Sequence, residues 1–258
     1  MIDFYGGATP NSRKVAIALL EFGERATLHH VDIECGDQFK PHFQGLNPNG
    51  KQPVIVDHGV ANGSGGGTRA PVIVWESGAI LQYLADKHAR LAGDGLAGRA
   101  AVNQWLMWQM SAIGPAGGQM AYFGRRCPRK LPLALERFSL ELQRLWSVLE
   151  THLKDHRFVA GTDYSIADIA IYPWWVALRE VPGVPRRTGR GQALRPALLN
   201  LRRARAPVRP HIEAWAESMR QRQAVRLGMT VFEDSLLLRD PAFATDRQLG
   251  DAAAVPLP

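Results

Sequence analysis

The stretch from Asn47 to Val56 constrains the fold of this chain most strongly. It opens with the turn sequence Asn-Pro-Asn-Gly and continues through Lys51, Gln52 and Pro53 into a β-branched run. Asn, Pro and Gly at this density indicate a tight turn, and the run after it predicts a strand that begins with a proline. A cis Gln52-Pro53 bond would leave the amide and carbonyl of Gln52 facing outward, where they can pair with another backbone. The sequence therefore predicts a strand edge that binds a peptide.

A second feature follows at residues 73–77. The run Ile73-Val74-Trp75 predicts a strand, and it leads directly into a helix that opens with Glu76 and Ser77. The first amides of a helix have no partner inside the helix, so they bind carboxylates readily. An ordinary turn or a capped helix would explain either feature alone. Together, in this order, they indicate a peptide-binding edge beside a carboxylate pocket.

Length and composition bound the class of protein. A chain of 258 residues with 46% apolar residues can bury a real core, in one large domain or two modest ones. No apolar run reaches membrane-spanning length, and Arg13, Lys14 and Glu21 in the first helix-like segment argue against a signal peptide. We therefore expect a soluble cytoplasmic protein without a membrane partner.

The two cysteines, Cys35 and Cys127, stand far apart in the sequence and form no Cys-x-x-Cys pair. This spacing suggests neither a disulfide framework nor an internal redox dithiol. Any sulfur chemistry would then depend on a bound thiol.

The formal charge of +7 is concentrated in one segment. Eight arginines and no Asp or Glu lie between Pro185 and Pro210: Arg186, Arg187, Arg190, Arg195, Arg202, Arg203, Arg205 and Arg209. Subtracting these eight charges from +7 leaves −1 for the rest of the chain. The segment could be a solvated insertion, an anion-binding patch or a disordered strap. It contains no aromatic residue, so nucleic-acid binding is not favoured.

The order of predicted elements over residues 1–88 is β-α-β-α-β-β-α. The segments are strands at 2–5 and 27–31, a helix at about 12–22, and a short helical or irregular piece at 38–45. Strands then lie on both sides of a glycine-rich loop at 62–67, and a helix follows residue 76. This order predicts an α/β thioredoxin-like domain with a mixed four-stranded sheet.

Beyond a linker at residues 88–98 the apolar periodicity is helical. Gly114-Pro115 should interrupt one helix, and Ser165 with Asp168 forms a capping box at the start of another. We expect an all-α domain over residues 98–232 with an Arg-rich insertion at about 185–206. Residues 233–258 would be a C-terminal tail.

The ordered set of motifs resembles the glutathione transferases. Within that superfamily the chain is most similar to the nu-class bacterial disulfide-bond oxidoreductases and the yeast nitrogen-regulator prion domain, over roughly residues 1–180 and again from near Pro207. The motifs that carry the resemblance are Thr9-Pro10-Asn11, Lys51-Gln52-Pro53, Glu76-Ser77-Gly78-Ala79-Ile80, Gln104 to Gln109, Gly114-Pro115 and Tyr164 to Asp168.

The resemblance implies a glutathione site with no metal. Gln52, next to Pro53, would pair its backbone with the cysteinyl unit, while Glu76 would face the ammonium and Ser77 the carboxylate of the γ-glutamyl unit. Gln38 and Lys51 are polar groups that could reach the glycyl carboxylate, although each also fits an ordinary surface position. The resemblance also implies a homodimer, in which the first domain of one chain packs on the helices of the other.

Catalysis would require stabilisation of the glutathione thiolate, because a thiol is only slightly ionised at neutral pH. Thr9 and Asn11 lie just before the first predicted helix, where a hydroxyl, an amide and the helix dipole favour negative charge. Many relatives use a Tyr or Ser here, but Tyr5 should lie inside the strand and Ser12 should cap the helix. We therefore expect a glutathione:disulfide oxidoreductase with weak conjugating or peroxidase activity. The alternative is a non-catalytic glutathione-binding scaffold or regulator.

Overall fold

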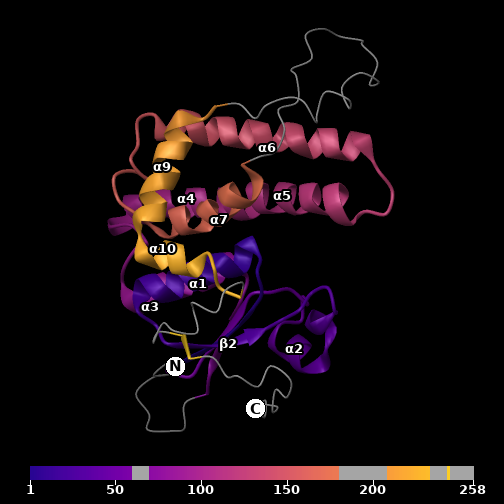
Figure 1. The fold of residues 1–258 in the computed structure, drawn as a ribbon. Helices are drawn as coiled ribbons and strands as arrows, with labels where there is room; N and C mark the ends of the chain where they lie inside the picture. The colour runs from indigo at the N-terminus through magenta and orange to yellow at the C-terminus, as the bar shows by residue number, and fades with distance from the viewer. Residues whose placement is uncertain (60–69, 180–207, 233–242, 245–258) are drawn as a thin grey trace. The chain divides into compact units, whose positions relative to one another are not determined.

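The computed structural model describes residues 1–59, 70–179, 208–232 and 243–244 (Figure 1). The chain divides into two compact units, Met1–Ala92 with Arg220–Pro258, and Gly93–Met219. The glycine-rich loop at 62–67 lies outside the described residues. So does the predicted Arg-rich insertion, and of the eight arginines near it Arg209 alone falls within the described ranges.

The first unit contains the predicted mixed sheet. Its four predicted strands lie in the order β4-β3-β1-β2, with β1 parallel to β2 and antiparallel to β3, and β3 antiparallel to β4. Their bounds are β1 Ile2–Gly6, β2 Ala26–His30, β3 Val54–Asp57 and β4 Val72–Trp75. The thioredoxin-like arrangement is therefore confirmed. A fifth short strand, β5 (Phe243–Ala244), pairs in parallel with β2, although the sequence predicted only a tail there.

Both faces of the sheet are buried at β3, which explains the unbroken apolar run in this strand. Val54 and Val56 pack on one face with Phe43 and Leu46 of α2 (Pro41–Leu46). Ile55 points to the other face because strand side chains alternate, and it is fully buried. Strand β3 thus has a core position at every residue, and it fixes the turn that precedes it.

Helix α1 (Pro10–Phe22) packs against α3 (Ser77–His88) and α10 (Gln223–Gly228). A Cβ at Gly228 would lie 2.6 Å from Ile17 Cγ1, so only glycine permits this approach. Arg222 and Glu21 form a two-point ion pair, with Nε to Oε1 at 2.7 Å and Nη2 to Oε2 at 3.0 Å.

The sequence assigned residues 220–232 to the helical domain, but residues from Arg220 onward group with the first unit. Local periodicity reports that α10 is a helix and says nothing about which helix it packs against. The contacts of α10 with α1 are long-range and cannot be read from the spacing of apolar residues.

The described residues of the second unit are mainly helical, as predicted. Two π-helical segments, Gln109–Ile113 and Tyr122–Arg126, follow α4 and α5, and the predicted break at Gly114-Pro115 is the start of α5. The helices are α4 Gly95–Trp108, α5 Gly114–Ala121, α6 Pro132–Leu153, α7 Ile166–Leu178 and α9 Pro210–Gln221. Among the helices in the described ranges, none is long and apolar enough to cross a membrane.

The predicted capping box at the start of α7 is confirmed. Asp168 Oδ2 accepts from the amide of Ser165 at 3.0 Å, and Ser165 Oγ accepts from the amide of Ala167 at 3.2 Å. Asp168 Oδ1 also accepts from Trp215 Nε1 at 2.8 Å and from the amide of Val159 at 2.9 Å. This fully buried carboxylate ties three segments of the unit together.

Candidate functional site

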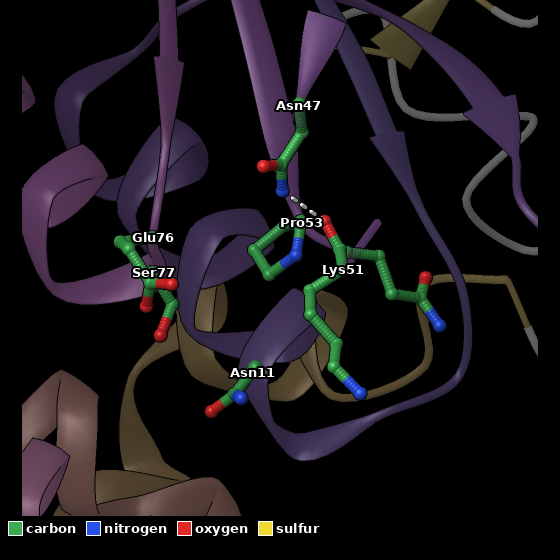
Figure 2. Close-up of a pocket in the computed structure, with 7 residues that line it drawn as sticks. Asn11, Asn47, Lys51, Pro53, Glu76 and Ser77 are labelled. Carbon is green, nitrogen blue, oxygen red and sulfur yellow. Dashed lines mark hydrogen bonds between the residues drawn. The ribbon is translucent and has the colours of Figure 1, made fainter. Parts of the chain in front are cut away.

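A pocket in the first unit gathers residues from three separate stretches of the chain. Figure 2 shows Glu76 and Ser77 on one side of it and Lys51 on the other, with Asn11 below them. Six of the eight predicted site residues line the pocket together with Asn47: Asn11, Lys51, Gln52, Pro53, Glu76 and Ser77. Thr9 and Gln38 are not among the lining residues.

The turn before β3 is held by the side chain of Asn47, which is buried. Its Nδ2 donates to the carbonyl of Lys51 at 2.6 Å, and its Oδ1 accepts from the amide of Asn49 at 2.9 Å. The Gln52-Pro53 bond is cis, which is the condition under which the backbone of Gln52 was expected to face outward. Sequence reasoning used Asn47 as a turn signal and missed it as a site residue. The tendency of Asn to bond backbone two residues on was the available clue.

Glu76 has an unusual backbone conformation, with φ 69° and ψ 117°. A positive φ in a residue with a Cβ costs on the order of 1–3 kcal/mol and is concentrated at functional sites. The Asn49 Nδ2 atom donates to Glu76 Oε1 at 3.4 Å. The strained residue lines the pocket, and α3 begins immediately after it at Ser77.

The start of α1 differs from the prediction. The helix begins at Pro10, and its N-cap is Thr9, not Ser12: Thr9 Oγ1 accepts from the amide of Ser12 at 3.3 Å and donates to Ser12 Oγ at 3.2 Å. The reason is that Pro10 suits the first helical position, where its missing N–H costs nothing. The hydroxyl of Thr9 thus caps the helix, whereas Asn11 lines the pocket.

Ser12 has a different role from the predicted cap. It is buried, its Oγ accepts from the amide of Gly7 at 3.3 Å, and it donates to Gln52 Oε1 at 3.4 Å. This link joins the first loop of the unit to the side chain of Gln52. The backbone of Gln52 consequently sits in a turn supported from two directions, by Ser12 and by Asn47.

Gln38 lies in the 3₁₀ segment Asp37–Phe39, outside the pocket. Its Nε2 donates to the carbonyl of Ile33 at 3.4 Å, and its buried Oε1 has no hydrogen-bond partner in the described part of the chain. Gln38 thus stabilises the loop after β2 through its hydrogen bond to Ile33. Its expected contact with a glycyl carboxylate remains a proposal.

Lys14 is the charged residue that sequence reasoning missed. It lies on α1 and is completely buried, with Nζ 3.3 Å from Ser77 Oγ in the pocket wall. Burial lowers the pKa of Lys14 well below its ordinary value, and the charge of Glu76 opposes that shift. A lysine directly before the apolar run Val15 to Leu19 was the signal that could have identified it.

Neither cysteine lines the pocket. Cys35 is exposed, and the neighbouring carboxylate of Asp32 raises the pKa of its thiol, which makes it a poor thiolate. Cys127 belongs to the second unit. Among the described residues, no group of three or more His, Cys, Asp or Glu side chains is arranged to hold a metal ion.

Comparison with known proteins gives a consistent result for both units. The family models of the glutathione S-transferase N-terminal domain and C-terminal domain match residues 8–87 and 132–218. The disulfide-bond oxidoreductase YfcG of Escherichia coli K12 is 42% identical over 174 residues, which cover 67% of this chain and 79% of that protein. YghU of the same organism, also a disulfide-bond oxidoreductase, is 34% identical over 238 residues, covering 89% and 74%.

A solved structure extends the likeness to three dimensions. The glutathione transferase from Pseudomonas putida, with one glutathione disulfide bound per subunit, is 32% identical to this chain. The alignment covers 89% of this chain and 91% of that one, with a TM-score of 0.71.

Proposed function

Because this chain belongs to the glutathione S-transferase superfamily, we propose that it is a glutathione-dependent disulfide-bond oxidoreductase. The observation that carries the proposal is that Gln52, Glu76 and Ser77 line a single pocket. By resemblance to the superfamily, these three residues would bind the cysteinyl and γ-glutamyl units of glutathione. Relatives such as YfcG, a disulfide-bond oxidoreductase, support the proposal.

The charges around the pocket suit a tripeptide with an ammonium and two carboxylates. Glu76 would face the γ-glutamyl ammonium, and Ser77 with the first amides of α3 would bind the adjacent carboxylate. Lys51, on the opposite side of the pocket in Figure 2, would attract the glycyl carboxylate. Between them the amide and carbonyl of Gln52 would pair with the cysteinyl backbone, in the manner of an added strand.

Asn11 is the side chain best suited to donate to the cysteinyl sulfur, since it lines the pocket at the start of α1. The dipole of α1 and its first amides favour a negative charge nearby. Thr9 would contribute by capping the helix and by orienting Ser12. In this proposal the two residues lower the pKa of bound glutathione together.

The reaction itself would be thiol–disulfide exchange. The glutathione thiolate attacks one sulfur of a substrate disulfide, a new S–S bond forms, and the other sulfur leaves as a thiolate that takes a proton. A second glutathione attacks the mixed disulfide and releases the second substrate thiol. Two glutathiones are thereby oxidised to glutathione disulfide while one substrate disulfide is reduced to two thiols. Weak conjugating or peroxidase activity would use the same thiolate.

Turnover of hydroxyethyl disulfide with glutathione tests the proposal, because glutathione disulfide can be quantified directly. The expected result is saturable, protein-dependent formation of glutathione disulfide. Binding of glutathione without turnover would instead favour a non-catalytic scaffold. Absence of binding at millimolar glutathione would reject both functions.

The proposal includes a homodimer. Three exposed apolar side chains, Leu133, Leu140 and Val148, share one face of α6 at helical spacing. These residues lie about two turns apart and form no continuous patch, so the proposed dimer rests chiefly on the resemblance to the superfamily. Light scattering at micromolar concentration should give twice the mass of the chain, and the mass of a single chain would reject the dimer.

A further inference from the structure

Directly behind the pocket wall lies a buried lysine. Lys14 on α1 has no exposed surface, and its Nζ atom is 3.3 Å from the Oγ atom of Ser77, which is also buried. Ser77 lines the pocket, whereas Lys14 does not. Lys14 would therefore influence a ligand indirectly, through its hydrogen bond to Ser77 and through the electric field of its own charge.

The direction of this hydrogen bond constrains the hydroxyl of Ser77. An ammonium group has three donors and no acceptor, so Nζ donates and Ser77 Oγ accepts. The hydroxyl hydrogen of Ser77 must then point to an acceptor other than Lys14. A hydroxyl that accepts from a cation is also polarised, and it becomes a stronger donor to the next group in the chain of hydrogen bonds.

The charge of Lys14 also influences which ligand group binds at Ser77. Burial lowers the pKa of Lys14, and the carboxylate of Glu76 acts against that shift by favouring the ammonium. A ligand carboxylate bound at Ser77 would act in the same direction as Glu76. The buried lysine therefore favours a negatively charged acceptor at this end of the pocket over a neutral one.

We propose that Lys14 is a positioning residue that directs the Ser77 hydroxyl toward the γ-glutamyl carboxylate of glutathione and so makes the pocket selective for that carboxylate. This inference rests on the proposed glutathione function. Lys14 touches neither the thiol nor the substrate disulfide in this account, so its effect is on ligand recognition.

The test compares two ligands by calorimetry with the full chain. One is glutathione, and the other is γ-aminobutyryl-cysteinylglycine, which lacks only the γ-glutamyl carboxylate. The parent protein should bind glutathione more tightly, and the ratio of the two dissociation constants measures carboxylate selectivity. Lys14→Met should lower this ratio about tenfold, the effect of one hydrogen bond to a charged group. Its affinity for the analogue should change less than about threefold, because the analogue has no carboxylate to lose.

Two further variants serve as controls. Lys14→Arg keeps the charge and the donors, so it should retain the parent ratio within about threefold. Lys51→Met removes a lysine on the opposite side of the pocket, so it should weaken both ligands equally and leave the ratio unchanged. Lys14→Gln, uncharged but polar, is measured in parallel and should lower the ratio even where the methionine variant does not fold.

The possible results distinguish failure of the role of Lys14 from failure of the proposed glutathione function. A parent protein that binds neither ligand rejects the proposed function. A parent protein that selects glutathione, with folded Lys14→Met or Lys14→Gln variants of equal selectivity, overturns the role of Lys14 alone. Loss of affinity for both ligands in equal measure would show that Lys14 only supports the fold, and would also overturn the inference.

Discussion

Asn47 Nδ2 donates to the carbonyl oxygen of Lys51 over 2.6 Å, and this bond closes the turn that presents Gln52 to the pocket. Asn47→Ala removes it together with the bond from the amide of Asn49. We expect the free energy of unfolding to fall by about 1–3 kcal/mol, because two partly buried hydrogen bonds to the backbone are lost. Affinity for glutathione should fall as well, since the turn is no longer fixed.

Asn49→Ala is the matched control for this change. Asn49 keeps its backbone amide bond to Asn47 and loses only a 3.4 Å contact with Glu76 on the exposed rim. Its effects on stability and affinity should be small. Equal effects of the two substitutions, measured by denaturant unfolding and calorimetry, would contradict the role assigned to Asn47.

Glu76 combines backbone strain with a binding role, and two substitutions separate these contributions. Glu76→Ala and Glu76→Gly both remove the carboxylate, and both should weaken glutathione binding by about 1.5–3 kcal/mol, the range for a hydrogen bond to a charged group. The glycine variant should be more stable than the alanine variant by about 1 kcal/mol, because glycine adopts a positive φ without a steric cost. Unchanged affinity in both would show that Glu76 does not contact the ligand.

Asn11→Ala tests the stabilisation of the thiolate. Losing one charge-assisted donor should raise the apparent pKa of bound glutathione by roughly one unit, which corresponds to about 1.4 kcal/mol. Thiolate absorbance followed against pH in the binary complex measures this directly. Thr9→Ala should in addition lower the free energy of unfolding by about 1 kcal/mol through loss of the helix cap. Titration of the Asn11 variant with the parent pKa would place the activating group elsewhere.

The parts of the site that sequence reasoning predicted are those with local signals. The turn from Asn47 to Gly50 is encoded in consecutive residues, and the apolar run of β3 directly follows it. The start of α3 at Ser77 likewise follows a strand without interruption. Each of these elements forms from neighbours in the chain, so a pattern of residue types is sufficient.

The features that were missed depend on contacts between distant segments. Lys14 reads as a surface lysine until α3 is packed over α1 and covers it. Helix α10 can pack on α1 because Gly228 has no side chain, and the sequence alone does not show that Ile17 lies opposite this glycine. At the start of α1 the sequence predicted Ser12 as the cap, whereas the structure has Thr9 there, because Pro10 takes the first helical position.

Asp168 should make the stability of the helical unit depend on pH. Burial raises its pKa to about 6, against hydrogen bonds that lower it. Between these two values the folded protein keeps a proton on Asp168 that the unfolded chain, in which the pKa of an Asp is about 3.9, has already released. By linkage, this group's contribution to the free energy of unfolding falls as the pH rises from about 4 to about 6, by roughly 3 kcal/mol in total, and is constant outside that window.

Asp168→Asn removes this titration, although it should destabilise the protein at every pH because the amide cannot accept all the donors. The difference in unfolding free energy between parent and variant should thus shrink as the pH rises from about 4 to about 6. Six of the seven tryptophans lie in residues 93–219, so tryptophan fluorescence reports mainly on the unfolding of this unit. Parallel pH profiles for the two proteins would contradict the raised pKa.

In the proposed reaction glutathione supplies the reactive thiols and the protein supplies the site. The most direct test is reduction of hydroxyethyl disulfide with glutathione by a Cys35→Ser, Cys127→Ser double variant, measured beside the parent. We expect the double variant to keep most of the parent rate, because the raised pKa of Cys35 disfavours its thiolate and neither cysteine lines the pocket. A loss of more than about 90% of the rate would show that a protein thiol carries the exchange, and that glutathione is not the only source of reactive thiols.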